Sequence, residues 1–225
     1  TPRVDAEAAV VRVETEVVNL HPRRRVCRLE TTLMAPDGTV AATAAAVAPL
    51  AAGERYTFLQ ELEVSRPARW DLGAPNLYTA ASTLWADGTE VDQFATRFGI
   101  RDIRMTPERG LLLNGRKVVA KGGDLHHDLG CLGSAALRSE YERRLDQLGA
   151  IGCNSFRLSH NPHAPVLLDA CDEKGVLVFA EAYDQWSSQF YGGEASFDSQ
   201  WEQDLTALLC RDRNHPCVYI WSMGN

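Results

Sequence analysis

Polar side chains that could act in binding or catalysis recur directly after four apolar stretches in the second half of the chain. The four groups are Asp124, His126, His127 and Asp128; Arg157, Ser159, His160 and Asn161; Glu181, Asp184, Gln185 and Trp186; and Ser222 and Asn225. If the apolar stretches are parallel strands, their carboxyl ends meet along one edge. We therefore expect the four groups to form one rim, which is the pattern of a catalytic face.

The residue types on this rim favour hydrogen bonding and charge pairing. His126 and His127 are adjacent and would point in opposite directions from an extended backbone, whereas zinc sites usually draw on spaced ligands. Arg157 lies inside a strand otherwise bound for the core, so it needs carboxylate partners; it either orients an acidic group or makes a structural ion pair. Ser159 and His160 lack the Gly-x-Ser-x-Gly turn of serine hydrolases.

The elements that position these residues alternate between strand and helix. We expect strands at 118–122, 155–159, 176–180 and 217–221, with helices between them marked by Leu137 to Leu148, Ala164 to Cys171 and Phe197 to Leu209. This β-α-β order predicts parallel strands with right-handed crossovers. A doubly wound sheet and a barrel both fit, but no Gly-x-Gly-x-x-Gly follows the first strand, which counts against a dinucleotide fold.

The first half of the chain has a different pattern. Apolar and polar residues alternate in short segments that turn signals separate, at 11–17, 26–34, 39–47, 56–64, 77–85 and 91–98. Such segments predict an antiparallel sandwich of immunoglobulin type, without a disulfide because Cys27 has no partner at the usual spacing. We expect this domain, residues 1–104, to be structural, and residues 105–225 to carry the site.

Composition limits the classes of function. The 225 residues are 45% hydrophobic and 24% charged, with a net charge of −7 and no basic stripe, which argues against nucleic-acid or anionic-membrane partners. No apolar run is long enough to span a membrane. The six cysteines form no Cys-x-x-Cys pair, so we expect free thiols, which favours the cytoplasm and leaves the periplasm open. The chain starts without Met at Thr1, and we expect a fragment of a longer protein.

In combination, these motifs resemble glycoside hydrolase family 2, most closely its β-galactosidase-like members. The resemblance rests on His126-His127-Asp128-Leu129-Gly130, Arg157-Leu158-Ser159-His160-Asn161-Pro162, Glu181-Ala182-Tyr183-Asp184-Gln185-Trp186, and Asn214-His215-Pro216 followed by Gly224-Asn225. Trp70, Asn76-Leu77-Tyr78 and Arg97-Phe98-Gly99 extend it into the first half. The resemblance implies a sandwich at 1–104 followed at 105–225 by the first half of a (β/α)₈ TIM barrel.

The resemblance also implies roles for single residues. Family members retain anomeric configuration with two carboxyl groups about 5 Å apart. By resemblance, a glutamate directly after Asn225 is the general acid/base and the nucleophile lies on a later strand, so we expect residues 1–225 alone to be inactive. Asn225 matches the asparagine that contacts the sugar 2-hydroxyl, His126 and His160 match histidines lining the sugar site, and Arg157 matches the arginine supporting the carboxylates. Asp128, Asp184 and Trp186 complete the expected substrate-binding set.

Several alternatives stay open. The expected activity is that of a retaining exo-β-glycosidase, most closely a β-galactosidase; β-glucuronidase, β-mannosidase and a non-catalytic carbohydrate-binding or scaffold fragment are the alternatives. Trp186 is either a platform for a sugar face or an ordinary rim aromatic. We expect no cofactor and leave magnesium open, because the Glu-x-His pair that holds it in some β-galactosidases is not present in Asp184–Gln189. The expected partner is a small carbohydrate, and a homo-oligomer stays open for the full-length protein.

Overall fold

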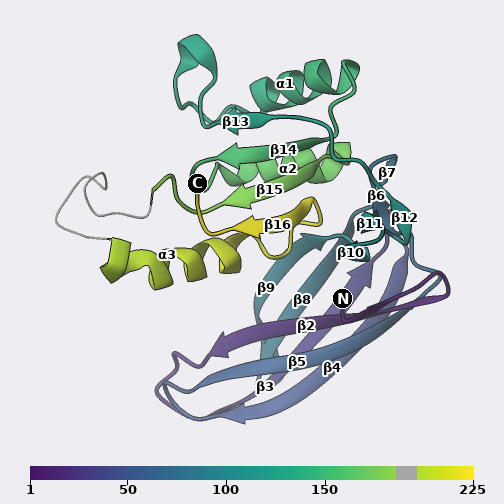
Figure 1. The fold of residues 1–225 in the computed structure, drawn as a ribbon. Helices are drawn as coiled ribbons and strands as arrows, with labels where there is room; N and C mark the ends of the chain where they lie inside the picture. Colours follow the sequence, from purple (N-terminus) through teal and green to yellow (C-terminus); the bar gives the residue numbers. More distant parts are fainter. Residues whose placement is uncertain (186–196) are drawn as a thin grey trace. The chain divides into compact units, whose positions relative to one another are not determined.

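The computed structural model describes residues 1–185 and 197–225 (Figure 1). The chain forms two compact units, residues 1–69 with 76–102, and residues 70–75 with 103–225. The short segment 70–75 groups with the second unit although it precedes the boundary at residue 104 that the sequence predicts. Trp186, one of the expected site residues, lies outside the described residues.

The first unit consists of two antiparallel sheets. One contains β1 (Arg3–Val4), β2 (Ala8–Val18) and β5 (Arg55–Ser65), and the other has the order β4 (Val40–Leu50), β3 (Arg25–Met34), β8 (Tyr78–Ala86) and β9 (Thr89–Phe98). The strands follow the six segments in which the sequence alternates. Along β5 every second residue is buried from Phe58 to Val64, as expected for a strand with one face in a core.

Two apolar clusters fill this sandwich. One contains Leu33, Leu62 and Ile100, and the other contains Leu29, Leu50 and Phe58. Gln60 also points inward, and its Oε1 accepts a hydrogen bond of 2.7 Å from the hydroxyl of Thr31, so the buried amide is satisfied. The interior of the unit is therefore a packed core in which the buried polar group has a partner.

The second unit starts with small antiparallel pairings. β6 (Trp70–Asp71) pairs with β7 (Ala74–Pro75), and β10 (Ile103–Thr106), β11 (Gly110–Leu113) and β12 (Arg116–Lys117) form a separate three-stranded sheet. Asn114, in the turn between β11 and β12, donates from Nδ2 to the Trp70 carbonyl at 2.9 Å. Trp70 is fully buried and donates from Nε1 to the Asp172 carbonyl at 2.8 Å. These bonds hold the segment 70–75 against the rest of the unit.

The main sheet of the second unit is parallel and has the order β13 (Asp124–His126), β14 (Ser155–Ser159), β15 (Leu177–Glu181) and β16 (Val218–Ser222). The connections between β13 and β16 contain α1 (Arg138–Ala150), α2 (Pro165–Lys174) and α3 (Phe197–Asp212) in turn. In Figure 1, α2 lies behind β14 and β15. The order of strands and helices agrees with the predicted β-α-β pattern.

α2 shows how the sequence sets the limits of a helix. Pro165 occupies its first turn, where the missing N–H is not needed, and Gly175 ends it in the left-handed region with φ of 67°. A Cβ at Gly175 would also lie 2.5 Å from the Leu72 carbonyl oxygen. Two requirements, a positive φ and a close backbone approach, therefore select glycine here.

The predicted strand at 118–122 is wrong, because the first parallel strand comes later, at Asp124–His126. The segment before it still runs beside β14, but through irregular bonds: the Lys121 carbonyl accepts from the amides of Asn154 and Ser155. A Cβ at Gly122 would lie closer to the Ser155 carbonyl oxygen than real Cβ atoms come to any atom. This close approach, which no local pattern reveals, accompanies the irregular backbone of 118–123.

Two further expectations from the sequence can be compared with the structure. All six cysteines are free, as predicted. No helix among the described residues has the length and apolar character needed to cross a membrane.

His163 is buried in the second unit and lies against the half-buried His127. His163 is 1% exposed and donates from Nε2 to the Ser159 carbonyl at 3.3 Å, and its ring lies 5.2 Å from the ring of His127. Burial lowers the pKa of His163 to about 4, against the opposing effect of the bond to Ser159. This side chain is therefore neutral at pH 7.

Replacing Gly122 by alanine should destabilise the second unit. The new methyl group has no room against the Ser155 carbonyl, so the backbone must shift, at a cost of about 3 kcal/mol or more. Gly123→Ala is the matched control, because a Cβ at Gly123 meets nothing within 4 Å. Urea unfolding of both variants checks this; equal losses of stability in the two would contradict the close approach.

The neutral state of His163 predicts loss of stability in mild acid. Its pKa is about 4 in the folded protein, whereas an ordinary histidine has a pKa of 6.5, so the unfolded chain takes up the proton first as the pH falls. The free energy of unfolding should therefore drop by about 2 kcal/mol from this side chain between pH 7 and pH 5. His163→Gln cannot titrate, and its unfolding free energy should fall less over this range; an unchanged pH slope would contradict the assignment.

Candidate functional site

A buried glutamate forms the centre of the polar rim. Glu181 is the last residue of β15, and its side chain is 1% exposed. Arg157 donates to it from Nε to Oε2 at 3.0 Å and from NH2 to Oε1 at 2.9 Å and Oε2 at 2.8 Å. His160 meets Oε1 through Nδ1 at 2.6 Å, and the Ser222 hydroxyl donates to Oε2 at 2.9 Å. Both carboxylate oxygens are thus occupied by partners from β14, β16 and the segment after β14.

The strand register brings these partners together. Glu181 is paired with Ser222 across β15 and β16, and residues paired in parallel strands point to the same face. Arg157 lies on neighbouring β14, opposite Phe179, two residues before Glu181, so its guanidinium extends along the same face toward the carboxylate. The guanidinium carbon lies 6.0 Å from the centre of the Phe179 ring.

The guanidinium of Arg157 connects the buried carboxylate to the surface. Its NH2 donates to Asn225 Oδ1 at 2.9 Å, and its NH1 lies 3.7 Å from Asp124 Oδ2. Asn225 in turn donates from Nδ2 to Asp184 Oδ1 at 3.4 Å, and its backbone N–H donates to the Tyr183 carbonyl at 3.0 Å. A chain of polar contacts therefore runs from a buried anion to an exposed amide.

Glu181 is ionised in this environment. Burial raises the pKa of Glu181, but hydrogen bonds from His160, Arg157 and Ser222, together with the positive charge of Arg157, hold it below its ordinary value. A buried carboxylate at this position is stable as an anion because its partners are donors. It therefore acts as a fixed acceptor inside the rim.

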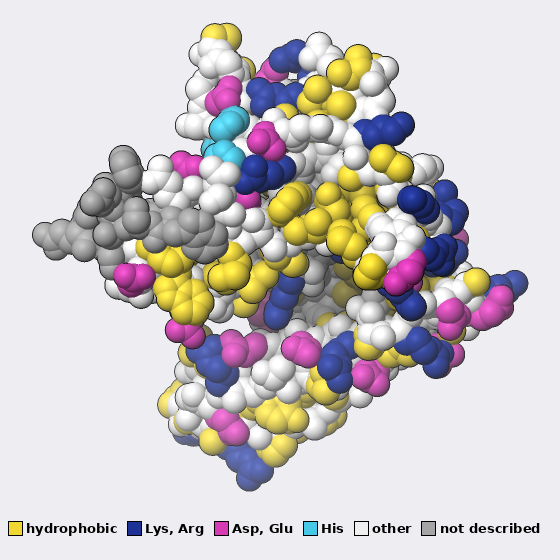
Figure 2. Space-filling model, in the orientation of Figure 1, with side chains coloured by type: hydrophobic (Ala, Val, Ile, Leu, Met, Phe, Trp, Pro, Cys, Tyr) yellow, Lys and Arg dark blue, Asp and Glu magenta, His cyan; other side chains and the backbone are white. Residues whose placement is uncertain are grey.

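The structure brings some of the expected site residues into one network and leaves Asp128 outside it. Arg157, His160, Asn225 and Asp184 join one network, and the His126 ring lies edge-on to the His160 ring at 5.5 Å. Asp128 is exposed, and its Oδ1 accepts a bond of 3.0 Å from the Gly130 amide in its own loop. Figure 2 shows histidine, basic and acidic side chains over the carboxyl ends of these strands and hydrophobic ones over their middle.

The substrate-binding set expected from the sequence does not include Glu181 and Ser222. Both follow apolar strands and so belong to the predicted rim. A signal was present for Glu181, because an acidic residue directly after the apolar run 176–180 and level with a strand arginine is a natural partner for that arginine. For Ser222 the sequence offers only its place at a strand end.

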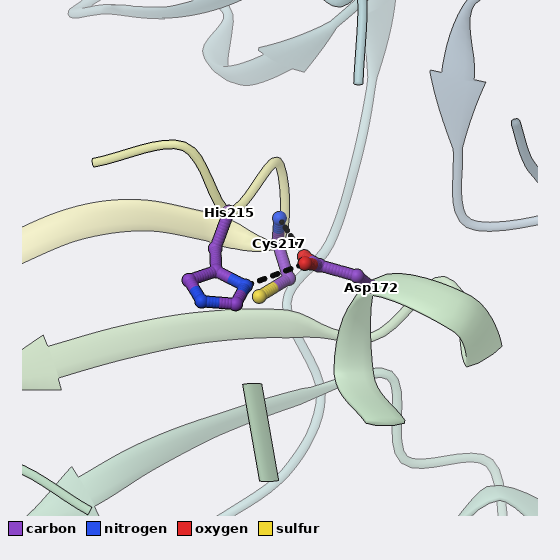
Figure 3. A group of neighbouring side chains, drawn as sticks. All are labelled: Asp172, His215 and Cys217. Carbon is purple, nitrogen blue, oxygen red and sulfur yellow. Dashed lines mark hydrogen bonds and ion pairs between the residues drawn. The ribbon is translucent and has the colours of Figure 1, made fainter. Parts of the chain in front are cut away.

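A second polar cluster lies at the opposite end of the same strands. Asp172, in the last turn of α2, accepts bonds from His215 Nδ1 at 2.6 Å and from the Cys217 amide at 3.0 Å (Figure 3). Among the described residues, Asp172, His215 and Cys217 are the one group of possible metal ligands that lie close together. The His215 imidazole and the Asp172 carboxylate are bonded to each other, and the Cys217 thiol donates to the Leu168 carbonyl at 3.7 Å. The cluster is therefore a hydrogen-bonded junction that ties α2 to the start of β16.

The imidazole of His215 is held by this junction. Burial lowers the pKa of His215, but its hydrogen bond to Asp172 and the negative charges of Asp172, Asp212 and Asp169 raise it above the ordinary value. His215 thus carries a proton toward Asp172 rather than a free lone pair toward a metal. The geometry supports a structural role.

Comparisons with known proteins agree with this architecture. The family descriptions that match are "Glycosyl hydrolases family 2" for residues 1–101 and "Glycosyl hydrolases family 2, TIM barrel domain" for residues 104–225. The chain is 37% identical over 227 residues to Beta-galactosidase BoGH2A of Bacteroides ovatus, and 33% identical over 228 residues to a putative beta-glucuronidase of Formosa agariphila. Both alignments cover 100% of this chain, but only 27% and 21% of the relatives.

Solved structures give the same result. A glycosyl hydrolase family 2 member from Bacteroides cellulosilyticus has a TM-score of 0.92 at 38% identity, with 100% of this chain and 30% of that chain covered. The beta-glucuronidase of Bacteroides uniformis has a TM-score of 0.86 at 29% identity, with 98% and 26% covered. The chain spans about a quarter of the length of the curated relatives it matches. It belongs to glycosyl hydrolase family 2, and it comprises that family's β-sandwich and part of its TIM barrel.

Proposed function

We propose that the whole protein hydrolyses terminal β-linked galactosides with retention of configuration, and that this chain supplies one wall of the sugar pocket. The observation that carries the proposal is the network of Glu181, Arg157, His160 and Asn225 at the carboxyl ends of parallel strands. Active sites in TIM barrels lie at that end of the strands. The 37% identical relative named as a β-galactosidase covers this whole network.

The wall is suited to neutral polyhydroxylated ligands. His160, Asn225 and Asp184 offer an imidazole, an amide and a carboxylate within one network, and these groups both donate and accept hydrogen bonds. His126 is exposed beside them. Sugar hydroxyls need both kinds of partner, which this set provides.

Glu181 is not one of the two reacting carboxyl groups in this proposal. Its side chain is 1% exposed and both of its oxygens accept bonds from three side chains, so it can neither attack an anomeric carbon nor protonate a leaving group. We place the proton donor at a glutamate directly after Asn225 in the whole protein, and the nucleophile on a later strand. Retention requires these two groups to lie about 5 Å apart.

A β-glucuronidase is the second candidate, supported by relatives of that name. Charge argues for the neutral sugar. The guanidinium of Arg157 already lies beside the carboxylates of Asp124 and Glu181, and the carboxylate of Asp184 accepts a hydrogen bond from the neighbouring Asn225. A uronate carboxylate would meet a negative field at this wall. The sequence after the third strand, at 184–189, also lacks the Glu-x-His pair that holds magnesium in some β-galactosidases, so no metal is part of the proposal.

A panel of nitrophenyl β-glycosides assayed with the whole protein tests this function. The β-galactoside should be hydrolysed with a kcat/KM at least about tenfold above those of the β-glucuronide and the β-mannoside. This ratio corresponds to about 1.4 kcal/mol of discrimination. Preference for the glucuronide would move the protein to the second candidate. Binding of galactose without release of nitrophenol from any member of the panel would favour a non-catalytic carbohydrate-binding protein.

Asn225→Ala tests the contact with the 2-hydroxyl. Its loss should lower kcat/KM for the β-galactoside about 100-fold, because bonds to this hydroxyl strengthen in the transition state. The 2-deoxy substrate lacks the hydroxyl, so the same substitution should change its kcat/KM by less than about threefold, within the non-additivity expected of such cycles. Equal losses with both substrates would show that Asn225 acts elsewhere.

A further inference from the structure

The buried carboxylate of Glu181 determines which nitrogen of His160 carries the proton. Nδ1 lies 2.6 Å from Glu181 Oε1. An ionised carboxylate only accepts hydrogen bonds, so Nδ1 must be the donor. In a neutral imidazole the other nitrogen, Nε2, then has a lone pair and can only accept.

The same carboxylate sets the orientation of the Asn225 amide through Arg157. The guanidinium has only donors, and its Nε and NH2 are directed at Glu181. NH2 also donates to Asn225 Oδ1 at 2.9 Å, which turns the amide oxygen inward. The Nδ2 group consequently faces Asp184, 3.4 Å away, with its donors on the exposed side. Asn225 thus presents a donor where His160 presents an acceptor.

We propose that Glu181 is a positioning residue that imposes opposite polarity on two neighbouring groups, with His160 Nε2 as the acceptor and Asn225 Nδ2 as the donor. The side chain of His160 is 18% exposed, and Asn225 is exposed, so both groups reach the surface of the wall. That they meet sugar hydroxyls rests on the proposed function. The fixed tautomer of His160 is independent of the proposed function, because it follows from the hydrogen bond to Glu181.

Glutamine in place of Glu181 reverses one part of this arrangement. Oε2 accepts from Arg157 Nε, Arg157 NH2 and Ser222, whereas Oε1 accepts from Arg157 NH2 and His160. The single oxygen of glutamine should therefore occupy the Oε2 position and place its amide group toward His160. Nδ1 must then accept, and the proton moves to Nε2.

Nitrogen-15 NMR of histidine-labelled protein tests the tautomer without any substrate. In the unchanged protein His160, assigned by its loss in His160→Gln, should give the signature of protonated Nδ1 and bare Nε2 at pH 7.5. Glu181→Gln should give the reverse signature, and Glu181→Asp, which keeps an ionised acceptor, should retain the original one. A proton on Nε2 in the unchanged protein would overturn the proposal even if a variant fails to fold.

Asp212→Asn is the matched control for loss of a buried carboxylate. Asp212 is 1% exposed and pairs with Arg211 through two bonds of 2.7 Å, much as Glu181 pairs with Arg157, but it lies at the end of α3 away from the rim network. This control should reduce stability and leave the His160 signature unchanged. A changed signature in the control would show that the tautomer follows general loosening of the unit.

Kinetics of the whole protein form the second arm. Glu181→Gln should lower kcat/KM for the β-galactoside about 100-fold, whereas Asp212→Asn should change it less than threefold. A reversed tautomer with unchanged kcat/KM would overturn the substrate part of the proposal. Absence of turnover in the unchanged protein would count against the proposed function alone, since the tautomer is measured independently.

Discussion

The pairing of a buried glutamate with a strand arginine is the interaction on which the polar rim depends. Removing an ionised carboxylate from water costs several kcal/mol, and Glu181 recovers this only because donors surround it. Those donors come from β14, β16 and the segment after β14. A one-residue slip of β15 would turn the carboxylate to the other face and leave it without them. The anion thus makes the strand register a condition of stability.

The opposite end of the sheet has a comparable junction with a different outcome. Asp172 is also a buried carboxylate with a histidine partner, and it ties α2 to the start of β16. Its backbone carbonyl further accepts from Trp70, which brings the segment 70–75 into the unit. Here the partners face the interior, whereas the partners of Glu181 continue outward to Asn225. The same chemistry therefore serves packing at one end of the strands and the proposed binding surface at the other.

Much of this could be predicted from the sequence, for reasons that differ between elements. The alternation in β5 and the apolar run before Glu181 report burial directly, so both elements were predictable. The error at 118–122 has a tertiary cause, because the contact of Gly122 with Ser155 joins residues 33 positions apart. Arg157 signalled that a carboxylate must exist but not which one. Only the packed strands show that the carboxylate of Glu181 bonds Arg157 through both oxygens, whereas Asp184 bonds Asn225.

A sugar hydroxyl can donate or accept, so a pocket that binds it selectively must have groups whose own direction is fixed. Imidazole and amide side chains do not have this property by themselves, since each can reverse its donor and acceptor atoms. A carboxylate, which only accepts hydrogen bonds, and a guanidinium, which only donates them, remove that freedom when they bond to the imidazole and the amide. Glu181 and Arg157 make these bonds in the proposed pocket. Their contribution is preorganisation: the cost of orienting the polar groups is met by folding, before any ligand arrives.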